Sequence, residues 1–210
     1  MSLSQCLVPV AVFAALLASG CDRDGTQAVP AVSRSPATYV GASACTACHV
    51  AEVEAWQGSH HDLAMQPVSE QTVLGDFDDA KFESAGRITT FFRRDDGWFV
   101  NTDGPDGQLA DYAIKYTFGI TPLQQYLVEF PDGRLQALSI SWDSRPAEQG
   151  GQRWFHLYAG QNVTHDDPLH WTRPSQNWNF MCAECHSTDL RRNYDAATDR
   201  FTTQWSDIDV

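Results

Sequence analysis

The pattern of apolar and polar positions divides the chain into stretches of different character. Residues 6–18 form a nearly unbroken apolar run, and the stretch that follows, up to residue 38, is small, polar and proline-containing. Residues 42–65 follow a helical pattern, whereas residues 85–142 alternate apolar runs with turn residues. The apolar run is too short to span a bilayer as a mature helix, which needs about 20 residues. It fits the apolar core of an export signal.

Residues 42–65 are predicted to be helical. Val53 and Trp56 share one helical face with His49. Gly58 weakens the middle of this helix.

Residues 85–142 are expected to form an antiparallel meander. Asp-Gly pairs, such as those at residues 96–97 and 132–133, separate apolar and β-branched runs and indicate about five strands joined by hairpins. Residues 143–178 look mainly irregular, and a second short helix is expected over residues 180–190. The predicted fold class is therefore α+β, with short helical segments flanking the meander.

Each predicted helical segment contains a five-residue motif with strong chemical meaning. Both motifs read C-x-x-C-H, the attachment sequence of a c-type haem. The two thiols bind the haem covalently, and the adjacent histidine reaches the iron as proximal ligand. Two covalent haems c are therefore expected. The predicted attachment residues are Cys45, Cys48, Cys182 and Cys185, and the predicted proximal ligands are His49 and His186.

The cysteine count bears on this interpretation. The chain has six cysteines, and the two outside the motifs, Cys6 and Cys21, lie in the amino-terminal export region, so haem attachment leaves none in the rest of the chain for a structural disulfide. Zinc or a disulfide within a motif remains the alternative. A zinc ribbon, however, normally separates its cysteine pairs by about 15–20 residues. The pairs here lie much further apart, and a histidine follows each of them.

A six-coordinate haem iron needs a second axial ligand, usually histidine or methionine. The remaining candidates are His60, His61, His156, His165, His170, Met65 and Met181. The supply of histidine favours low-spin irons with two histidine ligands. His170 is a leading candidate because it shortly precedes the second motif in an irregular stretch that can fold back over a haem, and His156 and His165 are close rivals.

The helical pattern constrains His60 and His61. Either side chain lies roughly 16–18 Å along a continuous helix from His49. We therefore expect them to serve a neighbouring haem unless the chain reverses.

The amino-terminal residues indicate export. Residues 1–20 are interpreted as a signal peptide, and the stretch from Leu17 to Cys21 resembles a bacterial lipobox. Lipidation of Cys21 would anchor the protein to the membrane, on the periplasmic side. The signal has no Lys or Arg at its start, so an ordinary signal cleaved nearby is the alternative. Residues 21–38 are expected to be a flexible tether, and residues 39–210 a dihaem cytochrome c domain with a β-rich insert.

The charge is strongly acidic, with 27 acidic and 14 basic residues and a net charge of −13. This balance excludes the basic patches that nucleic-acid binding requires. It suits docking to a basic redox partner protein, although an acidic surface also serves solubility alone.

The first haem segment resembles the multihaem cytochrome c554 family, in which C-x-x-C-H is followed by W-x-x-S-x-H. Trp56, Ser59 and His61 match the second element. The resemblance implies that His61 is an axial ligand of another haem. Residues 177–188 resemble the second haem segment of exported multihaem proteins that also carry tetratricopeptide repeats. Such relatives continue with a further motif and helical repeats, so this chain is expected to be an N-terminal fragment.

These features together predict a periplasmic cytochrome that transfers electrons between redox partners, rather than an enzyme. One alternative is a haem enzyme acting on a small nitrogen or sulfur oxyanion. Another is a non-catalytic haem sensor or assembly module. No motif in the sequence identifies the open iron position and acid–base groups that an enzyme needs.

Overall fold

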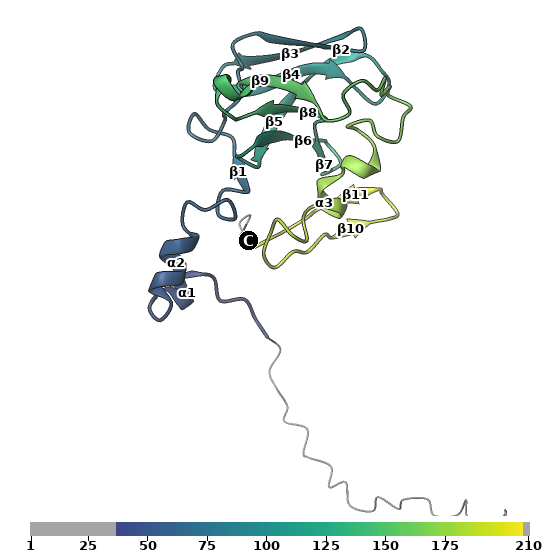
Figure 1. Ribbon diagram of the computed structural model, residues 1–210. Helices are drawn as coiled ribbons and strands as arrows, with labels where there is room; N and C mark the ends of the chain where they lie inside the picture. The colour runs from purple at the N-terminus through teal and green to yellow at the C-terminus, as the bar shows by residue number, and fades with distance from the viewer. Residues whose placement is uncertain (1–36, 208–210) are drawn as a thin grey trace, which may run out of the picture. The chain divides into compact units, whose positions relative to one another are not determined.

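The structure, a computed structural model, describes residues 37–207 (Figure 1). The described fold lies within the unit Tyr39–Val210. The predicted signal peptide, the lipobox cysteine Cys21 and almost all of the tether lie outside the described residues. Between residues 37 and 207, no helix has the length and apolar character needed to cross a membrane.

Nine strands form one antiparallel sheet. Their bounds are β1 Met65–Pro67, β2 Ala80–Ser84, β3 Arg87–Arg94, β4 Gly97–Asp103, β5 Leu109–Phe118, β6 Leu123–Glu129, β7 Leu135–Ala137, β8 Ile140–Asp143 and β9 Arg153–His156. The order along the sheet is β2-β3-β4-β5-β6-β8-β9, with β1 paired to β5 and β7 paired to β6. The edge strands β2 and β9 approach each other, so the sheet curls into a nearly closed barrel (Figure 1).

Local sequence explains how the sheet turns. Ala85 and Gly86 both have positive φ, at 49° and 75°, and close the β2–β3 hairpin as a two-residue loop. The register of β5 against β6 shifts between Ile114 and Tyr116. A bulge of this kind bends a strand and increases its twist. The long strand β5 therefore pairs with β4 along its first half and with β1 and β6 along its second half.

Aromatic side chains fill the barrel. The buried cluster consists of Phe77, Phe91, Trp98, Val100, Ile114, Tyr126, Val128, Leu138, Trp142, Trp154 and Trp171. Phe91 of β3 stacks on Trp154 of β9 with ring centroids 3.5 Å apart. An aromatic pair adds about 0.5–1.5 kcal/mol beyond its burial, so this contact helps to close the barrel between strands that are not hydrogen-bonded neighbours.

A second buried cluster connects the sheet to the second C-x-x-C-H motif. Its members are Met65, Leu127, Leu135, Ala137, Trp178 and Ala183. Ala183 lies inside the motif, and Trp178 lies just before it. The motif is therefore part of the packed structure.

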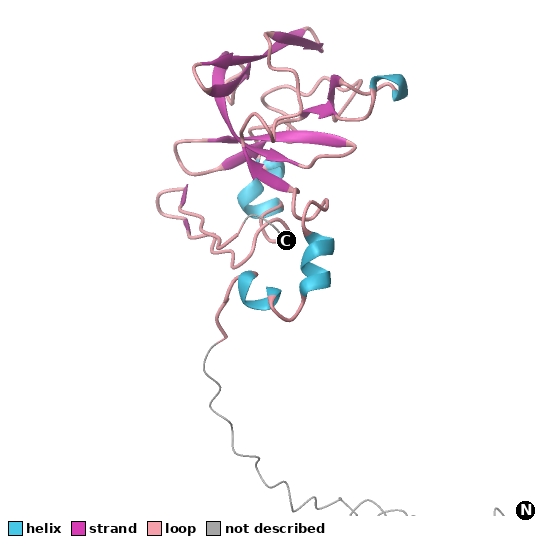
Figure 2. Cartoon of the chain, turned by 90° about the vertical axis from the view of Figure 1, so that its left-hand side faces the viewer, coloured by secondary structure: helices cyan, strands magenta, loops and turns pink. Residues whose placement is uncertain are grey.

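Three short helices and a small hairpin complete the described residues. The helices are α1 Ser43–Thr46, α2 Val50–Trp56 and α3 Trp178–Met181, with 3-10 turns at Ala147–Gln149 and Pro174–Gln176. Strands β10 Tyr194–Asp195 and β11 Arg200–Phe201 form the hairpin. Both views place α2 and α3 beyond the same end of the sheet (Figures 1 and 2).

The α+β prediction is wrong, because the described residues are mostly β. The helix expected over residues 42–65 ends at Trp56, where Gly58 adopts a φ of +72° that a helix excludes, and its last residue, Met65, instead begins β1. The helix expected over residues 180–190 is also misplaced. It starts at residue 178, after the Asn177 side chain accepts a hydrogen bond from the Phe180 amide, and ends before the motif.

The meander is also longer than the five strands expected. Strands β1 and β2 begin before residue 85, and β9 lies in a stretch expected to be irregular. These strands are short, and their conformation depends on pairing with distant strands rather than on a local alternation of residue types.

Candidate functional site

The first C-x-x-C-H motif joins α1 to α2. The backbone amides of Cys48 and His49 both donate to the Cys45 carbonyl, at 3.1 and 3.0 Å. Hydrogen bonds of this span close one helical turn, which brings the two thiols and the imidazole to neighbouring positions. Both thiols are free and exposed, as is His49, whose Nδ1 lies 3.9 Å from the Glu52 carboxylate.

The second motif makes the same turn. The amides of Cys185 and His186 donate to the Cys182 carbonyl, at 3.0 and 3.1 Å. Cys185 is exposed and Cys182 is half-buried, and both thiols are free. Burial, and then the neighbouring Cys185, raise the pKa of the Cys182 thiol. The two motifs therefore share their backbone geometry and differ in their surroundings.

His186 is held by the barrel. Its ring lies against Phe118, at the end of β5, with ring centroids 4.5 Å apart. Burial lowers the pKa of His186, so the ring is neutral, which is the form that binds metals. Its Nδ1 is buried and has no hydrogen-bond partner among the described residues. A buried ring nitrogen without a partner is costly, so Nδ1 has an unused hydrogen-bonding capacity, and the neutral ring is in the form that binds a metal.

A network of polar contacts fixes the second motif on the sheet. Glu184, inside the motif, pairs with Arg192 at 2.6 Å, and the Arg192 Nε donates to the Asn179 carbonyl. The buried Asn179 side chain accepts a hydrogen bond from the Leu135 amide in β7 at 2.8 Å. Ser187 donates its hydroxyl to the Ala183 carbonyl at 2.6 Å. The network joins the motif turn to strand β7.

An apolar surface lies beside the second motif. Phe180 and Met181, which directly precede Cys182, are 49% and 64% exposed. Phe180 contacts Tyr194 and Phe201 of the small hairpin edge-on. Exposed apolar side chains next to two free thiols are suited to the flat apolar face of a porphyrin.

The W-x-x-S-x-H element forms a tight turn. The Ser59 hydroxyl accepts hydrogen bonds from the amides of His61 and Asp62, at 3.2 and 3.3 Å. The Asp62 carboxylate in turn accepts from the Gly58 amide at 2.6 Å. This reciprocal capping fixes the backbone that carries His60 and His61, and both histidines are exposed. The predicted distance of roughly 16–18 Å from His49 assumed a continuous helix. This turn interrupts that helix.

His170 occupies a different environment. It is 3% exposed, its Nε2 lies 3.3 Å from Asp103, and its Nδ1 lies 2.9 Å from the Thr172 hydroxyl. Both ring nitrogens therefore have protein partners. Of its rivals, His156 accepts a hydrogen bond from the Tyr158 amide on Nδ1.

The remaining predicted ligands also have protein contacts. The Nε2 of His165 lies 3.4 Å from Asp166. Met65 is fully buried in the cluster that packs against the second motif. Across residues 37–207, no three or more His, Cys, Asp or Glu side chains are grouped so as to hold a metal ion.

Several residues that shape the site have no signature in the sequence. Phe118 lies in an ordinary strand-like run, and Asn179 is one of many polar residues. Their roles depend on contacts with His186 and Leu135, which are remote in the chain. Only the fold brings them together.

Comparisons with known proteins assign the first haem segment. The family described as cytochrome c554 and c-prime matches residues 44–89. This range contains the first C-x-x-C-H motif, the turn that carries His61, and strands β1 and β2. Searches of curated proteins and of solved structures found no match. The match does not test whether the chain is an N-terminal fragment, and this stays a prediction. The motif, its geometry and the family match together support a c-type cytochrome assignment for the segment 44–89, which is similar to the cytochrome c554 and c-prime family.

Proposed function

We propose that this c-type cytochrome carries two covalently bound haems and transfers electrons between redox partner proteins in the periplasm. The observation that carries the proposal is the repetition of one backbone turn, each copy presenting two free thiols followed by a histidine. Haem supplies one-electron chemistry between ferrous and ferric iron. The proposed attachment residues are Cys45, Cys48, Cys182 and Cys185, with His49 and His186 as proximal ligands.

The chain's own residues position the proposed sites. Phe118 supports the neutral His186 ring, and Asn179 and Arg192 hold the second motif against the sheet. Support of this kind limits the rearrangement of the ligand when the charge of the site changes. Low reorganisation favours electron transfer over chemistry that needs an open and mobile site.

The number of attached haems tests the proposal. Protein matured with the haem-attachment machinery should gain two haems by intact mass and by pyridine haemochrome assay. Cys48→Ala and Cys185→Ala should each weaken or remove one attachment. Cys21→Ala is the matched control, because this cysteine lies outside both motifs and its loss should leave two haems. A single haem in the unaltered protein, or zinc in place of haem, contradicts the proposal.

The same control variant tests the proposed location. A lipid anchor on Cys21 would hold the protein at the periplasmic face of a membrane. Cys21→Ala should then move from the membrane fraction to the soluble periplasmic fraction. An unchanged N-terminus and unchanged membrane association in this variant rule out the anchor.

His61 is the proposed distal ligand. The Ser59 turn fixes its backbone and leaves its side chain exposed. His170 is left out of the proposed set, since ligation would break a contact to Asp103 or Thr172. Low-temperature EPR should show loss of one low-spin signal in His61→Ala and no change in His60→Ala, its exposed neighbour. Equal spectra for the two variants exclude His61. A high-spin signal in the unaltered protein favours an enzyme or a sensor.

A further inference from the structure

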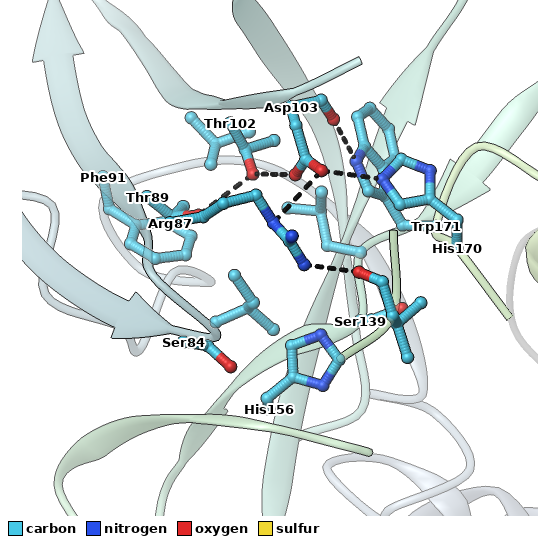
Figure 3. Close-up of a pocket in the computed structure, with 14 residues that line it drawn as sticks. Ser84, Arg87, Thr89, Phe91, Thr102, Asp103, Ser139, His156, His170 and Trp171 are labelled. Atoms are coloured by element: carbon cyan, nitrogen blue, oxygen red, sulfur yellow. Dashed lines mark hydrogen bonds and ion pairs between the residues drawn. The ribbon is translucent and has the colours of Figure 1, made fainter. Parts of the chain in front are cut away.

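A cavity with a mixed apolar and polar lining lies at the seam where the barrel is not hydrogen-bonded, between the β2–β3 hairpin and β9 (Figure 3). Its volume is about 30 Å³. Apolar side chains from the barrel core, Phe91, Leu138 and Trp171, form part of its wall. Arg87, Ser139 and His156 also line it (Figure 3). None of these residues belongs to either haem motif.

The acceptor groups of this cavity are already in use. The Asp103 carboxylate lies 3.3 Å from the Nε2 of His170 and 3.3 Å from the Nε of Arg87, and the Thr102 hydroxyl donates to it at 3.4 Å. Burial acts to raise the pKa of Asp103, but the hydrogen bond from His170 and the charges of His170 and Arg87 lower it overall. Asp103 is therefore ionised, and its carboxylate is in contact with Arg87 and His170 rather than free.

The unused polar groups can act as donors. Ser139 is 5% exposed, and its buried hydroxyl has no hydrogen-bond partner among the described residues. The Nδ1 of His156 accepts from the Tyr158 amide, so the neutral ring carries its proton on Nε2. Burial, and then Arg87, lower the pKa of His156 and keep the ring neutral.

Arg87, whose charge is paired with Asp103, adds further N–H donors to this set. Its guanidinium donates to the Val163 carbonyl and to the Asn162 side chain, and its side chain is 31% exposed. A guanidinium presents five N–H donors, so these contacts leave capacity for a further acceptor. The partial exposure shows that solvent reaches the cavity mouth.

We propose that this cavity binds a small monovalent oxyanion, with Arg87, Ser139 and His156 as its hydrogen-bond donors. The volume is about two to three times the roughly 10–15 Å³ that one water needs, which is the size class of small oxyanions such as formate, with nitrate slightly larger. The acceptor oxygens of an anion match a site in which Arg87, although paired with Asp103, and two neutral groups have unused N–H and O–H donors. The apolar wall lowers the local dielectric and strengthens these hydrogen bonds.

Isothermal titration calorimetry on the haem-loaded full chain tests this site. Sodium nitrate and sodium formate are titrated at constant ionic strength, with sodium chloride as the non-oxyanion control. The haem absorption spectrum is followed in parallel and should not change, because the cavity is separate from both motifs. Saturable binding of one anion per chain is expected.

Variants then locate the site. Ser139→Ala removes one neutral donor and should weaken binding about tenfold, and Arg87→Gln should abolish it. Arg94→Gln is the matched control, because Arg94 lies on the same strand and pairs with Asp111 at the surface. Its binding should equal that of the unaltered protein.

Three results of the titrations and of the arginine variants overturn the proposal, and two further results also refute it. The first three are the absence of saturable heat with both oxyanions, a change in the haem spectrum that accounts for the heat, and equal loss of binding in the Arg94 and Arg87 variants. If Arg87→Gln does not fold, Ser139→Ala decides alone, and unchanged affinity in that variant refutes the site. Binding of chloride as tight as that of nitrate indicates an adventitious ion only and also refutes it.

Discussion

At the scale of single residues, Asp143 shows how one side chain controls the end of a strand. It closes β8, where its carboxylate is bound in bidentate fashion by Arg145, with oxygen–nitrogen distances of 2.9 and 2.6 Å. The Arg145 amide also donates to it. Hydrogen bonding to Arg145 lowers the pKa of Asp143 to about 2. Such pairs are stronger than ordinary neutral hydrogen bonds.

The lowered pKa predicts how acid should affect stability. A carboxylate whose pKa is lower in the folded than in the unfolded protein stabilises the fold above its ordinary pKa of 3.8. This contribution is lost as the pH falls from there toward 2. Asp143→Asn should therefore reduce the free energy of unfolding at neutral pH, and the difference from the unaltered protein should shrink below pH 3.8. Urea unfolding at a series of pH values measures it.

The control for this experiment is Asp96→Asn, in the exposed β3–β4 turn. It should change the unfolding free energy by less than about 0.5 kcal/mol at neutral pH. A difference between Asp143→Asn and the unaltered protein that persists undiminished at pH 2 shows that the Arg145 pair is not its cause.

Residue identity alone identified the two C-x-x-C-H motifs. These motifs can be recognised in the sequence because haem attachment requires two thiols and a histidine within one turn of chain. The structure contains that turn twice. The environment of His170 could not be predicted from the sequence. Its partner Asp103 lies 67 residues earlier in the chain, and no local pattern links the two. The pairing arises only when β4 and the loop after β9 meet.

At the scale of elements, the β6–β7 turn supports the small hairpin near the second motif. Gly133 in this turn has a φ of +82°, and a Cβ at this position would lie 2.2 Å from the Phe201 carbonyl oxygen. The Phe201 amide donates to the Asp132 carbonyl at 2.8 Å. The turn and strand β11 therefore meet through their backbones, at a distance that only glycine permits.

Gly133→Ala should destabilise the protein through both the backbone conformation and the clash. We expect a loss of about 3 kcal/mol, measured by urea unfolding. Gly160→Ala separates the two causes, because Gly160 has a φ of +78° but no atom within 4 Å of an added Cβ. It should lose only about 1–2 kcal/mol. Equal losses for the two variants would show that the contact with Phe201 contributes nothing.

The elements also show why sequence pattern predicted only part of the sheet. The Asp-Gly turns and β-branched runs of residues 85–142 correctly indicated antiparallel hairpins, because turn and alternation are local properties. The three residues of β1 and the four of β9 carry no such pattern, and they form strands only by pairing with β5 and β8. The helical periodicity of residues 42–65 was real up to Trp56 but was interrupted at Gly58.

At the scale of the whole molecule, the described fold consists of a barrel that supports the second C-x-x-C-H motif and of separate short segments that carry both motifs. The barrel forms a packed aromatic core, whereas α2 and α3, next to the two haem motifs, lie beyond one end of its sheet (Figures 1 and 2). The barrel contributes Phe118 and β7 to the second motif. A scaffold of this kind leaves the motif cysteines Cys45, Cys48 and Cys185 exposed, so the proposed haems would be open to a redox partner.

The net charge of −13 predicts how the proposed electron transfer should respond to salt. A strongly acidic protein attracts cationic partners over distances that salt shortens, from about 30 Å at 0.01 M to about 8 Å at 0.15 M ionic strength. The rate of reduction by a cationic one-electron mediator should fall on the order of tenfold over this range. An anionic mediator should show the opposite trend, and a neutral mediator of similar potential should show none. Stopped-flow absorbance of the haem bands measures all three rates. A cationic mediator whose rate does not depend on salt would mean that the acidic surface plays no part in bringing redox partners to the haems and serves solubility alone.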